Sequence, residues 1–111
     1  MVNTYLKGWR TVRKGRNKLE EDKWVTADVE NKGRFIKEKD LFGLFDVIAI
    51  KAGKTKLIQF KTNRMPSFKP YLKFAKDYPQ FDVEIWCWVN YKGWRIWKAL
   101  KNGKKKESKE T

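Results

Sequence analysis

The sequence predicts one α/β domain in which helices flank a mixed β-sheet. Two segments carry apolar residues at the spacing of an amphipathic helix, and five others carry the short apolar or alternating runs typical of strands. The predicted order is helix, three strands, helix and two strands, with no internal repeat. Because 111 residues suffice for one compact domain, we expect these elements to share one core.

The first part of the chain is predicted to contain a helix, a strand and a loop. Residues 6–22 favour a helix, since apolar residues fall roughly on one face and basic residues on the other, although Gly8 and Gly15 weaken this prediction. Residues 24–30 alternate and are rich in β-branched side chains, which indicates a strand. Residues 31–39 are polar and are expected to form a loop or a short ribbon.

Two apolar strands follow, at residues 45–51 and 56–62, joined by a short turn that contains glycine. They carry three polar residues where a core would have none. Asp46 opens the first strand, while Gln59 and Lys61 lie two residues apart on the second and therefore share a face. A carboxylate, a carboxamide and an ammonium group are thus predicted to form a small polar site on the sheet.

The last part of the chain is predicted to hold a helix, two strands and a tail. Pro66 begins an amphipathic helical pattern that ends before Pro79. Residues 83–90 and 94–100 have strong strand patterns separated by a glycine turn. Residues 101–111 are lysine-rich and poor in apolar residues, which predicts a flexible basic tail after a single domain at residues 1–100.

Composition and charge indicate a polyanionic partner. Lysine and arginine number 27 against 13 acidic residues, which gives a formal net charge of +14 and favours nucleic acid. No apolar stretch reaches the roughly 18–20 residues that span a bilayer, so a membrane partner is not expected. The absence of histidine excludes catalysis by a histidine base. Cys87 is the only cysteine, and a cytoplasmic location, in a host or virus-encoded protein, is expected.

The segments Asp40–Ile50 and Leu57–Asn63 together resemble the signature of the PD-(D/E)XK nuclease superfamily, above all the small archaeal and phage Holliday-junction-resolvase-like nucleases. The resemblance covers about residues 6–100. It implies a restriction-endonuclease-like core and a DNA endonuclease that uses magnesium or manganese. In this comparison Asp46 corresponds to the metal-binding aspartate, and Lys61 to the lysine that positions or helps to deprotonate the attacking water.

The sequence departs from this superfamily at two places. Gln59 stands where its members usually have Glu or Asp, and its uncharged oxygen should lower the affinity for metal, although some members do carry glutamine. Resolvase-like relatives also place a glutamate in the first helix, near Val12 of this chain, and none is found there. The missing charge would come from Asp40, which we favour because its loop can bring it beside Asp46, or from Glu30.

Basic residues cluster in segments that contain no acidic ones. Residues 47–76 include eight lysines and arginines and no Asp or Glu, a bias typical of phosphate contact, and the first helix adds a second basic surface. Recognition of the shape of duplex or branched DNA is expected over recognition of sequence. The residues expected to contact nucleic acid are Arg10, Arg13, Lys14, Arg16, Arg34, Thr62, Asn63, Arg64, Lys69 and Lys73.

The last two predicted strands each carry two tryptophans, and we expect the two on one strand to share a face of the sheet. The pairs are Trp86 with Trp88, and Trp94 with Trp97. Core packing is the first interpretation of these side chains. An exposed aromatic face in a homodimer is the second, and base stacking is the third. A two-fold dimer would suit a resolvase-like enzyme, which needs two active sites.

Most candidate site residues also have an ordinary structural interpretation, whereas Gln59, between Ile58 and Phe60, needs a partner for its amide. Asp46 could hydrogen-bond a turn at the start of a strand, Asp40 could cap a turn, and Lys61 could simply reach solvent. Two alternative functions therefore stay open. One is a catalytically weak or inactive DNA-binding module on the same fold, and the other is a basic RNA-binding protein.

Overall fold

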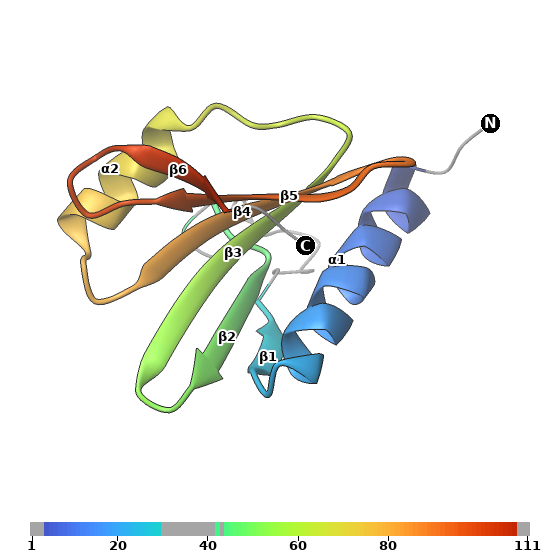
Figure 1. Cartoon of the computed structure of the whole chain (residues 1–111), viewed down its shortest axis with the longest axis horizontal. Helices are drawn as coiled ribbons and strands as arrows, with labels where there is room; N and C mark the ends of the chain where they lie inside the picture. Colours follow the sequence, from blue (N-terminus) through green and yellow to red (C-terminus); the bar gives the residue numbers. More distant parts are fainter. Residues whose placement is uncertain (1–3, 30–41, 43, 109–111) are drawn as a thin grey trace, which may run out of the picture.

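The computed structural model describes residues 4–29, 42 and 44–108, and shows one six-stranded sheet with a helix packed on each face (Figure 1). This architecture confirms the predicted α/β class and mixed sheet. The elements are α1 (Thr4–Glu21), β1 (Val25–Asp28), β2 (Val47–Lys51), β3 (Lys54–Thr62), α2 (Lys69–Asp77), β4 (Asp82–Val89), β5 (Gly93–Ala99) and β6 (Lys105–Ser108).

The six strands lie in the sheet in the same order as in the chain, and every neighbouring pair is antiparallel except β3 and β4. A parallel pair needs a crossover connection, which residues 63–81 provide with α2 in the middle. β3 is therefore an inner strand. It pairs with β2 from Val47↔Ile58 to Lys51↔Lys54 on one side, and with β4 on the other.

Strand alternation divides the core into two layers. The layer under α1 consists of Leu19, Trp24, Val47, Ala49, Ile58, Phe60, Trp86 and Ile96. The layer under α2 consists of Phe45, Leu57, Tyr71, Ala75, Val83 and Ile85. Even-numbered residues of the second half of β3 therefore face α1, while the odd-numbered residues of β3, including Gln59 and Lys61, face the side of α2.

Gly15 allows α1 to lie close against β3. A Cβ atom at position 15 would lie only 2.1 Å from Cε1 of the Phe60 ring. That ring has little room to move, because it packs edge-on against Trp86 at 5.7 Å and against Trp94 at 5.8 Å between ring centroids. Glycine is unfavourable within a helix, but at position 15 the close packing of α1 on Phe60 requires a residue without a side chain.

Gly15→Ala is expected to lower the free energy of unfolding by about 1–3 kcal/mol, the usual cost of overpacking a core. In an unconstrained helix the same change stabilises by about 1 kcal/mol, so the sign itself is diagnostic. Urea unfolding of wild type and variant measures the difference. Asn17→Ala, an exposed change in the same helix, is the control and should be neutral or mildly stabilising. A Gly15→Ala protein as stable as wild type would contradict the close approach.

Residues 105–108 correct the prediction of a flexible tail after residue 100. They form β6, which pairs antiparallel with β5, after a turn in which Gly103 has φ 83°. Arg95 donates two hydrogen bonds to Glu107, at 3.1 and 3.0 Å, and ties the new strand to the sheet. The lysine-rich composition of this segment is that of a disordered tail, so the strand was not predicted. Lysines are nevertheless common on the edge strands of natural sheets.

The prediction for the tryptophans of β5 is also wrong in one respect. Trp94 packs with Trp86 under α1, at 5.3 Å between ring centroids, whereas Trp97 lies on the other face against Phe68. A spacing of three residues places two strand residues on opposite faces. Core packing, the first interpretation, is confirmed for Trp86, which is buried.

Candidate functional site

Asp46 lies where β2 and β3 separate, one residue before β2 begins. Its backbone N–H donates to the carbonyl oxygen of Ile58 at 2.9 Å, and its carboxylate Oδ2 accepts a hydrogen bond from the backbone N–H of Phe60 at 3.1 Å. The side chain thus satisfies a main-chain donor of β3. This contact fixes a half-buried carboxylate against the inner strand of the sheet.

Gln59 is only 7 % exposed and contacts Asp46 directly. The surrounding oxygens assign its carboxamide nitrogen to the side of Asp46, where it lies 2.7 Å from the carbonyl oxygen of Leu44 and 3.3 Å from Asp46 Oδ2. The same Leu44 carbonyl accepts a hydrogen bond from the hydroxyl of Tyr71 at 3.1 Å. The buried amide therefore has the partners that a polar group in an inner strand requires.

Lys61 follows two residues beyond Gln59 on β3, so both side chains belong to the same face of the sheet. It is half-buried, and its partner across the parallel pair is the buried Cys87. Burial raises the pKa of the Cys87 thiol, which keeps this neighbour uncharged at neutral pH. The structure thus brings Asp46 and Gln59 into contact and carries Lys61 on the side of Gln59.

Other predicted ligands and contacts lie outside the described residues, namely Glu30, Arg34 and Asp40. Near Val12, where the resolvase-like nucleases that the sequence resembles have a glutamate, α1 provides Thr11, whose hydroxyl hydrogen-bonds that of Thr62 at 2.5 Å. Sequence reasoning missed Thr11, as it missed Tyr71, because their partners lie far away in the chain. No local pattern signals such contacts.

The side-chain oxygens of Asp46 and Gln59 are ligands of the type that a hard divalent cation prefers, but two residues offer few of them. Asp46 offers a carboxylate, while Gln59 would offer an oxygen only after its carboxamide rotates by half a turn. Among the residues that the structure describes, no three acidic or cysteine side chains gather into a metal site. The described donors therefore fit a weakly held magnesium or manganese ion, with Asp46 as the charged ligand.

Gln59→Glu is expected to raise the affinity for Mn²⁺ by about tenfold to a hundredfold, because a second carboxylate would face the cation. Without metal, the half-buried Asp46 carboxylate and the new buried carboxylate should repel each other and lower the melting temperature, and saturating Mn²⁺ should restore it. Calorimetric titration and thermal unfolding with and without Mn²⁺ measure both effects. Gln59→Leu is the control, since it removes the amide and adds no charge. Equal Mn²⁺ affinity in Gln59→Glu and wild type would contradict a metal site at this place.

Several predicted nucleic-acid contacts are exposed in the structure. Arg10, Arg13 and Lys14 lie on α1, with Nζ of Lys14 at 3.6 Å from the centroid of the Trp88 ring. Arg64 and Lys69 are exposed beyond the end of β3. All five side chains are exposed to solvent, and their role in binding nucleic acid stays a prediction.

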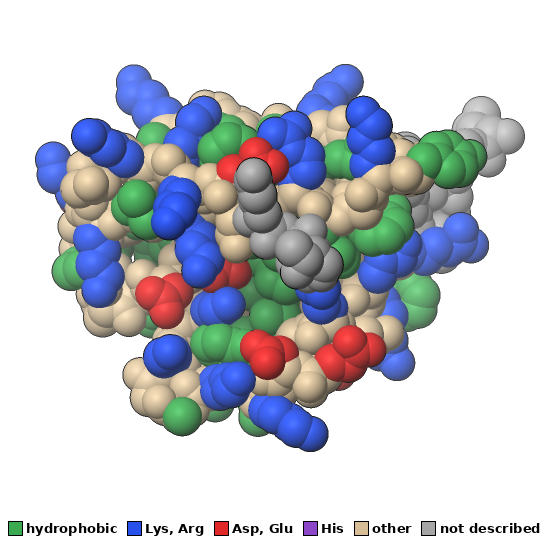
Figure 2. Space-filling model, in the orientation of Figure 1, with side chains coloured by type: hydrophobic (Ala, Val, Ile, Leu, Met, Phe, Trp, Pro, Cys, Tyr) green, Lys and Arg blue, Asp and Glu red, His purple; other side chains and the backbone are tan. Residues whose placement is uncertain are grey.

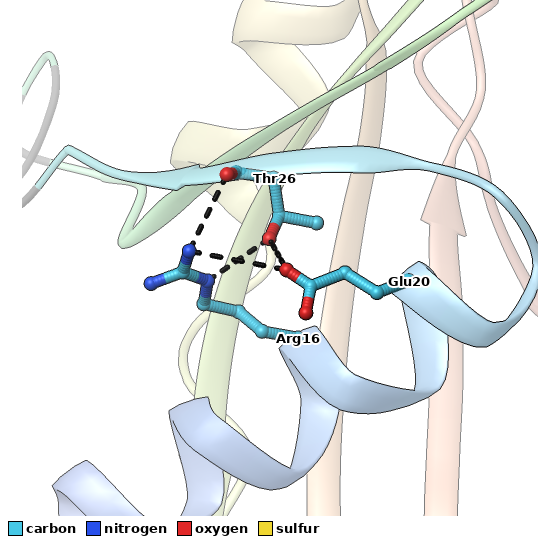
Figure 3. Close-up of polar contacts among 3 residues, drawn as sticks. All are labelled: Arg16, Glu20 and Thr26. Carbon is cyan, nitrogen blue, oxygen red and sulfur yellow. Dashed lines mark hydrogen bonds and ion pairs between the residues drawn. The ribbon is translucent and has the colours of Figure 1, made fainter.

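Arg16 has a structural role in addition to the predicted contact (Figure 3). Its Nε donates to the hydroxyl of Thr26 at 3.0 Å and its Nη2 to the Thr26 carbonyl at 3.3 Å, while Glu20 lies 4.0 Å from the same guanidinium. The Thr26 hydroxyl in turn donates to Glu20 at 2.7 Å. This network fastens α1 to β1, so the guanidinium is already engaged on one side.

Three other predicted contact residues also have partners within the protein. Thr62 hydrogen-bonds Thr11, and Asn63, at φ 59°, accepts a hydrogen bond from the backbone of Asn90 at 2.8 Å. Lys73 pairs with Asp77 at 2.6 Å, and this hydrogen bond raises the pKa of the lysine. Both groups of that pair are well exposed to solvent, so the pair adds little to stability.

The order of strands, the single parallel pair and the helix on each face correspond to a restriction-endonuclease-like fold. A solved structure that shares it is Hjc, a Holliday junction resolvase from the archaeal hyperthermophile Archaeoglobus fulgidus. The TM-score is 0.57 at 18 % sequence identity, and the match covers 81 % of this chain and 70 % of that one. The sequence matches no family model, and no curated protein is significantly similar to it. The comparison therefore establishes the fold.

Proposed function

We propose that this protein is a metal-dependent DNA endonuclease of the PD-(D/E)XK type, selective for DNA structure in the manner of a resolvase. The observation that carries the proposal is the direct contact between Asp46 and Gln59, with Lys61 on the same face two residues further along an inner strand. This is the arrangement that the superfamily resemblance assigns to the acid, the second ligand and the lysine. The fold shared with Hjc supports it.

Each residue has a separate task in the proposed reaction. Asp46 would hold magnesium or manganese through its carboxylate, and Gln59 would add a carboxamide oxygen after rotation. The bound ion would polarise the scissile phosphate and lower the pKa of water in its shell. Lys61 would orient the attacking water and offset the negative charge that develops on the phosphate. Asp40 and Glu30 are proposed as further ligands.

The exposed cations of α1 and of the segment after β3 would hold the DNA backbone. Because such contacts neutralise phosphates, affinity should fall steeply with salt, with a log-log slope of about −4.5 if about five phosphates are contacted. A homodimer would supply the two active sites that symmetric cleavage of branched DNA requires. In the described part of the chain, neither helix is long and apolar enough to cross a bilayer.

A second candidate is a DNA-binding module on the same fold that cleaves nothing. One observation favours it: the Gln59 carboxamide presents its nitrogen to Asp46, an arrangement that satisfies both groups with no ion between them. A basic RNA-binding protein would account for the charge and the aromatic residues but not for the contact between Asp46 and the buried Gln59. The three functions differ in what they do to labelled nucleic acid.

The test uses labelled single-stranded, duplex and four-way DNA with a matching RNA duplex, each with Mg²⁺, Mn²⁺, Ca²⁺ or EDTA. The endonuclease should nick DNA with Mg²⁺ or Mn²⁺ only, and should prefer the four-way junction. Binding to the junction in EDTA without cleavage under any condition would establish the second candidate. Tighter binding to RNA than to every DNA form would reject both DNA functions.

A further inference from the structure

The turn between β4 and β5 carries Tyr91 in an unfavourable setting. The N–H of Lys92 donates to the carbonyl of Val89 at 3.0 Å, and Tyr91, the third residue of this turn, has φ 68°. A positive φ at the third position of a turn favours glycine or asparagine, and a bulky residue there is strained. The tyrosine side chain is also fully exposed, so burial does not offset the strain. A residue that is strained and unburied suggests a role outside folding.

Two hydrogen bonds connect this turn to the strand that carries Lys61. The backbone N–H of Asn90 donates to Oδ1 of Asn63 at 2.8 Å, and the N–H of Asn63 donates to the carbonyl of Trp88 at 2.8 Å. Asn63 follows Lys61 by two residues. Tyr91 is therefore held beside the end of β3 at which the proposed catalytic lysine lies.

The surroundings of Tyr91 are cationic. Lys92 follows it in the turn, Arg64 follows Asn63, and both are exposed. On the side of α1, Lys14 covers the ring of Trp88 at 3.6 Å. Positive charges therefore lie in the turn itself, next to Asn63 and over Trp88, all on segments that join or contact the turn.

The three segments that meet here contain no acidic residue at all, namely residues 9–19, 47–76 and 85–106. In Figure 2 the coloured side chains at the upper right corner, where Figure 1 draws the β4–β5 turn and the beginning of α1, are hydrophobic or basic. An exposed aromatic ring within a surface of one charge sign is the combination that binds single-stranded nucleic acid, because the bases stack on the ring while the phosphates meet the cations.

We propose that Tyr91 is a stacking platform for an unpaired nucleobase of DNA, with Lys14, Arg64 and Lys92 contacting the flanking phosphates. The choice of DNA rests on the proposed function, which this inference deepens. It predicts that the preferred substrate contains unstacked bases, as a branch point or a single-stranded segment does. A fully paired duplex offers no base for the ring, since its bases are already stacked.

Tyr91→Asn tests the platform, because asparagine tolerates the left-handed backbone and lacks the ring. In EDTA, the variant should bind oligothymidylate about tenfold more weakly than wild type, within the range reported for base–aromatic stacking. Affinity for a fully paired duplex should be unchanged, and the melting temperature should not fall. Tyr91→Phe keeps the ring and should bind like wild type. Quenching of 2-aminopurine at an unpaired position should be lost in Tyr91→Asn and kept in Tyr91→Phe.

Ala52→Asn is the matched control, since Ala52 is an exposed residue at φ 42° in the β2–β3 turn. It should relieve backbone strain in the same way and leave DNA binding unchanged. Equal binding of oligothymidylate by Tyr91→Asn and wild type, or an equal loss for single-stranded and duplex DNA, would overturn the platform. Because binding is measured in EDTA, its outcome does not depend on whether the protein cleaves DNA. Stacking without any nuclease activity would reject the enzyme and keep the platform.

Discussion

Asp46→Asn is expected to reduce metal-dependent cleavage of DNA at least about a hundredfold, since it removes the proposed charged ligand of a site whose other described donor is neutral. Asparagine has nearly the same shape, and its side-chain oxygen can still accept the hydrogen bond from the Phe60 N–H that Asp46 accepts at 3.1 Å. The melting temperature should therefore change little. A loss of cleavage without a loss of folding would separate the chemical role of Asp46 from its structural one.

Lys61→Met provides the second half of this experiment, since methionine keeps most of the side-chain volume and removes the charge. The variant should retain affinity for Mn²⁺ and lose cleavage, because the proposed role of the lysine is to act on the water and the phosphate. Lys54→Met, an exposed change at the other end of β3, is the control and should cleave like wild type. Normal nicking by Asp46→Asn would reject the ligand assignment, and normal nicking by Lys61→Met would reject the role of the lysine.

Lys56→Met is expected to lower the free energy of unfolding by about 3 kcal/mol, because it leaves a buried carboxylate without its cation. Glu84 is 2 % exposed, and its Oε2 lies 3.1 Å from Nζ of Lys56 while its Oε1 accepts a hydrogen bond from Trp86 Nε1 at 2.9 Å. The same ammonium group lies 4.4 Å from the centroid of the Trp24 ring. The ion pair thus forms part of the packing under α1.

A double variant identifies the cause of that loss. Adding Glu84→Gln to Lys56→Met removes the uncompensated charge and should recover part of the stability, so the two changes should be strongly non-additive. Lys73→Met breaks an exposed pair with Asp77 and should change stability little. Urea unfolding of wild type, Lys56→Met, Glu84→Gln, the double variant and Lys73→Met gives the comparison. Additive effects of the Lys56 and Glu84 changes would show that the ion pair does not contribute as a unit.

Several features of the site and the fold were predictable from the sequence because they depend on neighbours in the chain. Alternation placed Gln59 and Lys61 on one face, and the apolar runs around Asp46 identified the hairpin of β2 and β3. The orientation of the Gln59 carboxamide was not predictable. It depends on the Leu44 carbonyl and the Asp46 carboxylate, whose positions follow from the way in which β2 leaves β3.

The sequence by itself determined the α/β class, the order of the first five strands and both helices, the positive charge, and the common face of the two polar residues on β3. These properties arise from residue type and short-range periodicity, which the chain carries before it folds. Only the tertiary structure decided why Gly15 is tolerated in α1, how Arg16 is engaged, and that a lysine-rich segment becomes β6. Each of these depends on a contact between separate elements, and such contacts exist only once the helices and strands have packed together.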